Sequence, residues 1–209
     1  MLLRNFNFDI TVLVIAVIVM IAALMFHNIF QTWVAARLGD HSPRLAGFGA
    51  FEPARHLDGF GVILLLVLGF GWPRQIPVNS RNYRGRREAI VWYSGPLAYL
   101  IVSFVSFVIA RVLELNGGGS AALGFYLAGS TAILHAAINL FPVYPLDGGH
   151  AALHLGIQGL RRFVQQVAGY GNIGFIVLFL LLSMSGILGR LTAILTRFVY
   201  GLVQLIPGL

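Results

Sequence analysis

Long runs of apolar residues dominate the chain, separated by short segments in which polar residues, glycine and proline gather. A helix needs about 20 mostly apolar residues to cross the roughly 30 Å of hydrocarbon in a bilayer. The pattern therefore predicts about four transmembrane helices, at residues 10–26, 89–110, 121–141 and 173–188. The fold class that follows is an all-α integral membrane protein, with a single domain over residues 1–209.

Two further segments are apolar but do not read as spans. The run at residues 60–70 is too short to cross and is followed by Gly71-Trp72-Pro73, which predicts a re-entrant or interfacial hairpin. The tail at residues 191–209 predicts an amphipathic interfacial helix. The first helix contains neither proline nor glycine as far as Ala36, so we expect it to continue past its apolar part and stop at Gly39.

Composition and charge exclude several classes. The chain is 58% hydrophobic and 10% charged with a mean hydropathy of +0.84, which excludes an ordinary soluble domain. All 14 basic residues are arginine, and eight of them lie between Arg37 and Arg87. The positive-inside rule places that loop and Asp147 on the cytoplasmic side of a prokaryotic-type inner membrane. We expect no nucleic-acid partner, because no soluble basic face with stacking aromatics is present.

The residues around Asp147 form the most informative break in the apolar pattern. Prolines and glycines interrupt the chain between Asn139 and His150. Irregular backbone at membrane depth must be covered by protein or water, and an ionisable group there is costly, so the segment indicates a site. The alternative is that Asp147 caps a helix that starts near Gly148.

Three strings resemble the motifs of one family. They are His27-Asn28-Ile29-Phe30-Gln31, Gly95-Pro96-Leu97-Ala98-Tyr99, and the run that contains Asn139, Pro142, Pro145, Asp147 and Gly148. They are similar to the HExxH, GPxxN and NxxPxxPLDGG elements of the site-2 protease family of intramembrane zinc metalloproteases, in particular its compact bacterial members. The likeness covers about residues 15–155. It implies that His27 and Asp147 occupy metal-ligand positions, and that Gly95, Pro96, Asn139, Pro142, Pro145 and Gly148 are structural.

The sequence departs from the family at three functional positions. Gln31 stands for the second histidine, Asn28 for the glutamate and Tyr99 for the asparagine. An amide is a poor zinc ligand beside imidazole, and asparagine cannot take and return a proton at neutral pH. The sequence therefore predicts a pseudoprotease without a cofactor, in which His27, Asn28, Gln31 and Asp147 form a polar cluster. Zinc, if bound, would use His27 and Asp147.

Two other metal sites stay open. His135 lies one helical turn before Asn139 and is a candidate third ligand, although a hydrogen bond to a neighbouring helix explains it equally well. Asp147, His150 and His154 stand at helical spacing and could form a displaced site, but an amphipathic helix with exposed histidines is the preferred interpretation. His41 and His56 are expected to be solvated.

The function we expect is binding. The chain would contact membrane lipid and hold transmembrane segments of partner proteins, or serve as a subunit of a larger membrane complex. The alternative is a zinc-dependent intramembrane endopeptidase with an atypical ligand set. A transporter fits least, because the candidate intramembrane ionisable groups cluster toward one side.

Overall fold

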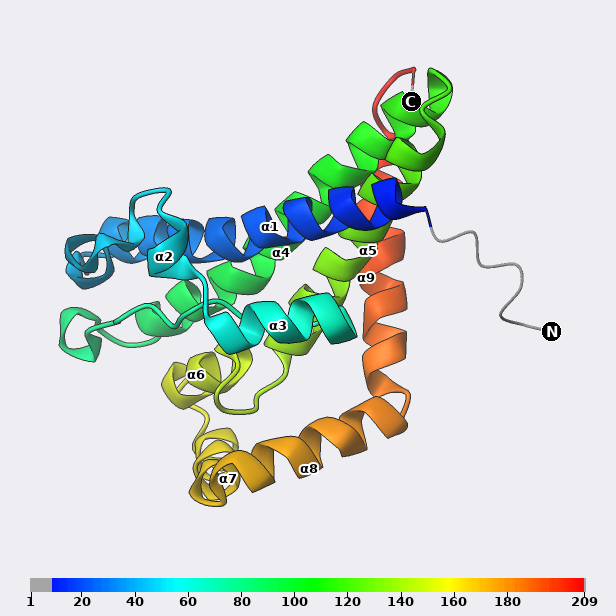
Figure 1. Cartoon of the computed structure of the whole chain (residues 1–209). Coiled ribbons are helices and arrows are strands. Elements are labelled where there is room, and N and C mark those ends of the chain that lie inside the picture. Colours follow the sequence, from blue (N-terminus) through cyan, green and yellow to red (C-terminus); the bar gives the residue numbers. More distant parts are fainter. Residues whose placement is uncertain (1–8, 209) are drawn as a thin grey trace.

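The computed structural model describes residues 9–208, apart from the side chains of residues 172, 175 and 176. Helices connected by short loops build the described chain, and no strand occurs within it (Figure 1). In order, the elements are α1 (Ile10–Arg37), the π-helical turn η2 (Arg44–Phe48), α2 (Pro53–His56), α3 (Gly59–Leu68), the 3-10 turn η3 (Ser80–Asn82), α4 (Arg87–Leu115), α5 (Gly119–Leu140), α6 (Asp147–His154), α7 (Gln158–Gly169), α8 (Gly171–Met184) and α9 (Ile187–Gln204).

The helices α1, α4 and α5 pack together as the centre of the fold. Each is long and apolar enough to cross a membrane, which confirms the first three predicted spans. Glycines on α5 allow close packing: a Cβ on Gly124 would lie 2.8 Å from Ile15 Cβ, and one on Gly129 would lie 2.6 Å from the Phe107 ring. In lipid there is no hydrophobic driving force between helices, so their association depends on the close van der Waals packing that such small residues allow.

The ends of α1 match the expectation from the sequence. Asp9 caps its first turn by accepting a hydrogen bond from Thr11 N at 2.9 Å. At the other end the helix stops at Arg37, and Gly39 adopts a φ of 100°, a conformation that glycine tolerates best. The helix therefore extends one and a half turns or more beyond its apolar part and carries polar residues with it.

A hairpin follows, with α3 as its helical arm. The helix has ten residues and ends at Gly69 in the left-handed region, after which the chain returns in extended form. The two arms touch backbone to backbone: a Cβ on Gly61 would lie 2.2 Å from Trp72 O, and one on Gly71 would lie 2.1 Å from Gly61 O. The short apolar run is thus a hairpin and not a span, as predicted.

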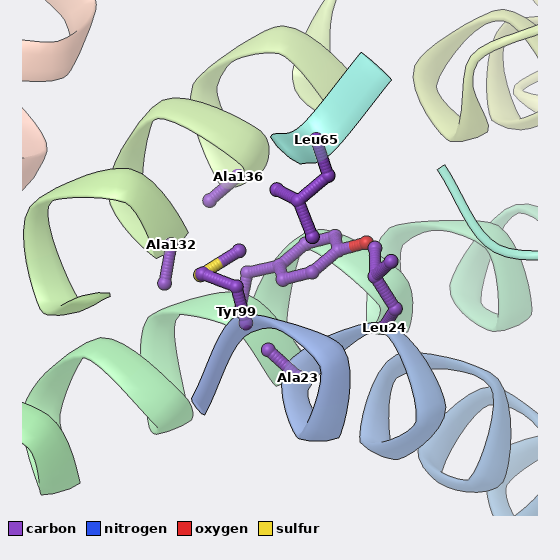
Figure 2. Packing of buried hydrophobic residues seen from close by; sticks show 7 residues of the cluster. Ala23, Leu24, Leu65, Tyr99, Ala132 and Ala136 are labelled. Carbon is purple, nitrogen blue, oxygen red and sulfur yellow. The ribbon is translucent and has the colours of Figure 1, made fainter. Parts of the chain in front are cut away.

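The core between these elements centres on an aromatic ring. Tyr99 of α4 is fully buried and lies among small and aliphatic side chains from three other helices (Figure 2). These neighbours are Met20, Ala23 and Leu24 of α1, Leu65 of α3, and Ala132 and Ala136 of α5. The hairpin therefore contributes to the same core as the spans.

The C-terminal helices complete the fold. α8 has 14 residues, about 21 Å at 1.5 Å per residue, which is short of the hydrocarbon thickness. Residues 177–184 and α9 form a pair bent by 65°, so the described residues contain three helices that are long and apolar enough to cross a membrane, or four such segments if this pair counts as one. α9 is amphipathic as expected: it buries Val199 and Val203 against α4 and α5 and exposes Ile194 and Phe198.

The segment before the hairpin corrects one expectation. His56 is not solvated: it is fully buried, its Nε2 donates to Ala50 O at 2.7 Å, and its ring packs edge-on against Phe48. His41 is exposed as expected. Sequence could not separate the two, because both are single histidines in a polar stretch and only the folding of η2 against α2 covers one of them.

Candidate functional site

His27 and Asp147 meet at the centre of the site. α1 supplies His27 and the start of α6 supplies Asp147, and the distance from His27 Nε2 to Asp147 Oδ2 is 2.7 Å. Both residues are buried, at 4% and 7% exposure. The two side chains, 120 positions apart in the sequence, therefore form a buried hydrogen bond.

The loop before α6 explains how Asp147 reaches this position. Glycines allow the loop to fold tightly onto the helix: a Cβ on Gly148 would lie 2.3 Å from Phe141 O, and one on Gly149 would lie 2.4 Å from Tyr144 N. The Tyr144–Pro145 peptide is cis. Asp147 is the first residue of α6 and follows the N-cap Leu146, and the hydrogen bond that its carboxylate makes among the described residues is the one to His27. Its carboxylate is thus directed at His27, and the capping alternative does not describe it.

Asn28 links His27 to the hairpin. Its Nδ2 donates to Arg74 O at 2.7 Å, and its Oδ1 lies 3.0 Å from His27 Nδ1. A backbone carbonyl can only accept, so the amide must present nitrogen to Arg74 and oxygen to His27, whose Nδ1 therefore carries a proton. Asn28 fixes the orientation of the imidazole, and its own amide is fully engaged.

Gln31 is the next polar side chain of the cluster. Pro96 explains why Gln31 bonds to a backbone carbonyl of α4. Gln31 Nε2 donates to Trp92 O at 3.3 Å. In α4 that carbonyl lies four residues before Pro96, which has no N–H to bond to it. The proline thus leaves an acceptor inside the helix, and the amide of Gln31 satisfies it from α1. A buried carbonyl without a partner would cost about 1–3 kcal/mol.

Gly95 provides the space in which the polar side chains converge. A Cβ at this position would lie 2.2 Å from Asp147 Oδ2, 2.3 Å from His27 Nε2 and 2.5 Å from Gln31 Nε2. The missing side chain at Gly95 thus makes room for the polar ends of three side chains.

These donors do not fit a hydrolytic zinc site. Such a site needs three nitrogen, sulfur or carboxylate ligands and an open position for water. Here one imidazole and one carboxylate meet an amide, and no group of three or more His, Cys, Asp or Glu side chains gathers among the described residues. The amide oxygen of Gln31 would be a weak third ligand. No catalytic base stands at position 28.

His135 lies near this cluster but has its own partners. Its Nδ1 donates to Thr131 O at 2.8 Å, and its Nε2 accepts from Gly71 N at 3.2 Å. The ring of Tyr99 packs against both histidines, with centroid distances of 4.8 Å to His27 and 5.3 Å to His135. His135 holds the hairpin to α5, and Tyr99 stands between it and the cluster.

The residues of the displaced site face three different partners. Asp147 contacts His27, whereas His150 stacks on Trp92 with ring centroids 4.2 Å apart. The amide of Gln75 contacts His150 Nε2, and burial lowers the pKa of His150. His154 Nε2 lies 3.2 Å from Glu88 Oε1. The helical spacing of the three side chains therefore does not bring them together.

Two buried carboxylates were not singled out from the sequence. Asp40 has no exposed surface and accepts four hydrogen bonds, from Ser42 N, Asn79 N, Asn82 Nδ2 and Tyr83 OH, at 2.8–3.0 Å. Glu88 accepts from Ser80 Oγ and Trp92 Nε1 as well as facing His154. The Asp-x-Ser spacing after Gly39 signals a local turn, but no pattern in the sequence gives the contacts across 40 residues.

Comparison with known proteins adds two relatives. A Bacillus subtilis (strain 168) protein named "Putative zinc metalloprotease YwhC" is 36% identical over 172 residues, which cover 78% of this chain and 78% of the relative. A Mycolicibacterium smegmatis (strain ATCC 700084 / mc(2)155) protein named "Putative zinc metalloprotease Rip2" is 26% identical over 172 residues, 77% of this chain and 63% of that protein. No family model and no solved structure matches the chain.

Proposed function

Because the chain belongs to the site-2 protease family, we propose that it keeps the family's membrane fold without its peptide hydrolysis. Its role is to bind transmembrane segments of other proteins, as a scaffold or as a subunit of a membrane complex. Zinc is not part of this proposal.

The amides at positions 28 and 31 carry the proposal. Peptide hydrolysis at a zinc site needs a base that accepts and returns a proton, and such a base contributes about a hundred- to ten-thousandfold in rate. Asn28 cannot act in this way, and its amide is engaged with Arg74 O and His27 Nδ1. Gln31 is engaged with Trp92 O. Asn28 therefore joins α1 to the hairpin and Gln31 joins α1 to α4, so both side chains serve the fold instead of a reaction.

Metal content tests this directly. We expect mass spectrometry to find no stoichiometric zinc in the detergent-purified protein. The control His41→Ala, which removes an exposed histidine outside the cluster, should give the same zinc content as the unmodified chain. The double variant Asn28→Glu, Gln31→His restores the HExxH pattern and is expected to gain zinc, and adding His27→Ala should remove it again. Stoichiometric zinc in the unmodified chain that disappears in both His27→Ala and Asp147→Ala would instead support the zinc-dependent endopeptidase with an atypical ligand set.

The exposed faces of α3 and α8 are the surfaces that we assign to partners. α3 exposes Phe60 and Val67, and α8 exposes Val177 and Leu181. α8 packs mainly against α7 and α9, its neighbours in sequence, so most of its length is available to another helix. Apolar surface of this kind suits a neighbouring transmembrane segment or lipid.

A crosslinking pair separates a protein partner from lipid. A photo-reactive residue at Val177 should give discrete protein adducts in native membranes. The same residue at Ile18, which is exposed on α1, should react with lipid alone. Equal protein adducts from both positions, or none from Val177, would contradict the proposed binding face.

A further inference from the structure

A polar cavity lies where the end of α4 meets α9. It has a volume of about 180 Å³ and is lined by Arg111, Tyr200, Val203 and Gln204. This is several times the roughly 30 Å³ that one water molecule occupies in the liquid. In Figure 1 the C-terminal end of α9 reaches the turn between α4 and α5, far from the hairpin and α6. The cavity is therefore separate from the His27–Asp147 cluster.

The charges beside the cavity are of both signs. Arg111 Nη1 donates to Glu114 Oε2 at 2.8 Å, and Tyr126 OH donates to the same oxygen at 3.4 Å. A guanidinium has five N–H groups in a planar fork, and no further hydrogen bond of Arg111 is found among the described residues. The cavity thus offers donors that match a phosphate group, with a carboxylate next to them.

The position along α4 places the cavity at the level of lipid headgroups. Arg111 follows Arg87 by 24 residues, which is about 36 Å along a helix. A bilayer measures about 40–45 Å with its headgroup regions and roughly 30 Å without them. α9 forms the other wall, and Tyr200 and Gln204, one helical turn apart, lie at the level of Arg111.

We propose that this cavity binds the headgroup of a zwitterionic phospholipid of the phosphoethanolamine class. The phosphate contacts the free N–H groups of Arg111, and the ammonium lies beside Glu114. Because Arg111 and Glu114 form an ion pair, the site as a whole is near neutral, which favours a headgroup with both charges over one with a single negative charge. Tyr200 and Gln204 supply further polar contacts to the phosphate.

The experiment measures lipid retention by the full-length chain in detergent by native mass spectrometry. We expect phosphatidylethanolamine to be retained in preference to phosphatidylglycerol, and Arg111→Gln to reduce that retention at least about tenfold, because hydrogen bonds to a charged group are strong. Arg190→Gln is the matched control: it removes an exposed arginine of α9, the helix that carries Tyr200 and Gln204, ten residues or about 15 Å before Tyr200. This control should retain the lipid like the unmodified chain.

A second variant keeps the proposal testable if Arg111→Gln does not fold. Glu114→Gln leaves the guanidinium unpaired and positive, so the preference should shift toward phosphatidylglycerol. Equal loss of lipid in Arg111→Gln and Arg190→Gln would overturn the proposal, as would an unchanged preference in Glu114→Gln. Glycerophosphoethanolamine and inorganic phosphate distinguish the source: competition by phosphate alone at equal concentration would show an anion site and would also overturn it.

Discussion

Asn28 shows how a single side chain determines what the cluster is able to do. A carboxylate at this position could accept the proton of a water molecule but could not donate to Arg74 O. The amide donates to that carbonyl and accepts from His27 Nδ1 at the same time. The hydrogen bond from Asn28 to Arg74 O, 46 residues away, thus requires asparagine in place of the catalytic glutamate. Through this bond the altered HExxH-like motif holds the hairpin to α1.

Replacing Asn28 by leucine tests this role. Asn28→Leu keeps a similar volume but leaves the buried His27 Nδ1 and the part-buried Arg74 O without partners, and an unpaired buried polar group costs about 1–3 kcal/mol. We expect the free energy of unfolding in detergent to fall by about 2 kcal/mol. Asn116→Leu is the control, because the Asn116 amide, like that of Asn28, donates to a backbone carbonyl but is exposed. It should cost less than about 1 kcal/mol, since water can replace the bond. Equal losses would contradict the role of Asn28.

Asp40 gives a prediction on pH. Burial raises the pKa of its carboxyl, but hydrogen bonds from Asn79 N, Ser42 and Asn82 outweigh this and leave the pKa below the ordinary 3.8. A depressed folded-state pKa means that the stabilisation is present above the ordinary value and is lost as the pH falls through the folded value. The protection of the loop amides at residues 79–83 against hydrogen exchange, relative to the unfolded chain at the same pH, should therefore stay constant from neutral pH down to about 4 and fall below it.

The variant Asp40→Asn isolates this contribution. It removes the charge that the loop amides and Tyr83 OH contact, so the loop should exchange faster at neutral pH and lose the acid-dependent step. A variant with the same acid-dependent step as the unmodified chain would show that another group titrates there. Sequence reasoning did not find the role of Asp40, because three of its four hydrogen-bond partners come from residues 79–83 and no periodicity links these residues to the end of α1.

At the scale of the element, α4 shows how a helix can keep its course through a glycine and a proline. Glycine and proline both weaken a helix interior, yet α4 runs through Gly95-Pro96 from Arg87 to Leu115. Pro96 has no N–H for Trp92 O, and Gln31 of α1 donates to that carbonyl instead. Gly95 has no Cβ, and the polar ends of the cluster side chains fill that space. The two residues that weaken the helix in isolation are thus the ones that join it to α1 and α6.

A single methyl group should therefore break the cluster. Gly95→Ala places a Cβ within 2.5 Å of atoms of His27, Gln31 and Asp147, which must move apart. Overpacking costs about 1–3 kcal/mol, and parting His27 from Asp147 adds to it. The control is Gly201→Ala in α9, where the added Cβ meets nothing within 4 Å and alanine favours the helix by about 0.5–1 kcal/mol. The two changes should shift the unfolding midpoint in opposite directions, and a stabilising Gly95→Ala would contradict the cluster geometry.

The elements that sequence predicted well are those whose signal is local. Long apolar runs gave the three central helices, the short run gave the hairpin, and the amphipathic pattern gave α9, because each follows from hydropathy within one segment. The motif around Asp147 gave its partner His27. The predicted fourth span at residues 173–188 is matched only in part, because α8 ends at Met184 and the chain bends by 65° before α9. The roles of Arg74 O and Trp92 O could not be predicted, since backbone carbonyls carry no side-chain identity.

At the scale of the whole molecule, the distribution of arginine predicts the direction in which the helices insert into the membrane. The arginines between Arg37 and Arg87 gather at one end of α1 and α4, and Asn116 lies at the other end of α4. The positive-inside rule predicts that the arginine-rich end and the Asp147 end face the cytoplasm. Because the sequence has no cysteine, single cysteines report their own position without background. Both Arg84 and Asn116 are exposed and suit this purpose.

In intact cells, Asn116→Cys should react with a membrane-impermeant maleimide, and Arg84→Cys should react only after the membrane is opened. The cavity beside Arg111 would then face the outer leaflet, and the proposed headgroup would come from that leaflet. The reverse labelling pattern would leave the cavity intact but move its lipid to the inner leaflet. It would also show that eight arginines do not set the orientation of this chain, so that the cytoplasmic placement of Asp147 would be wrong. Labelling of both cysteines in intact cells would indicate a mixed insertion, and no side could then be assigned to the cluster.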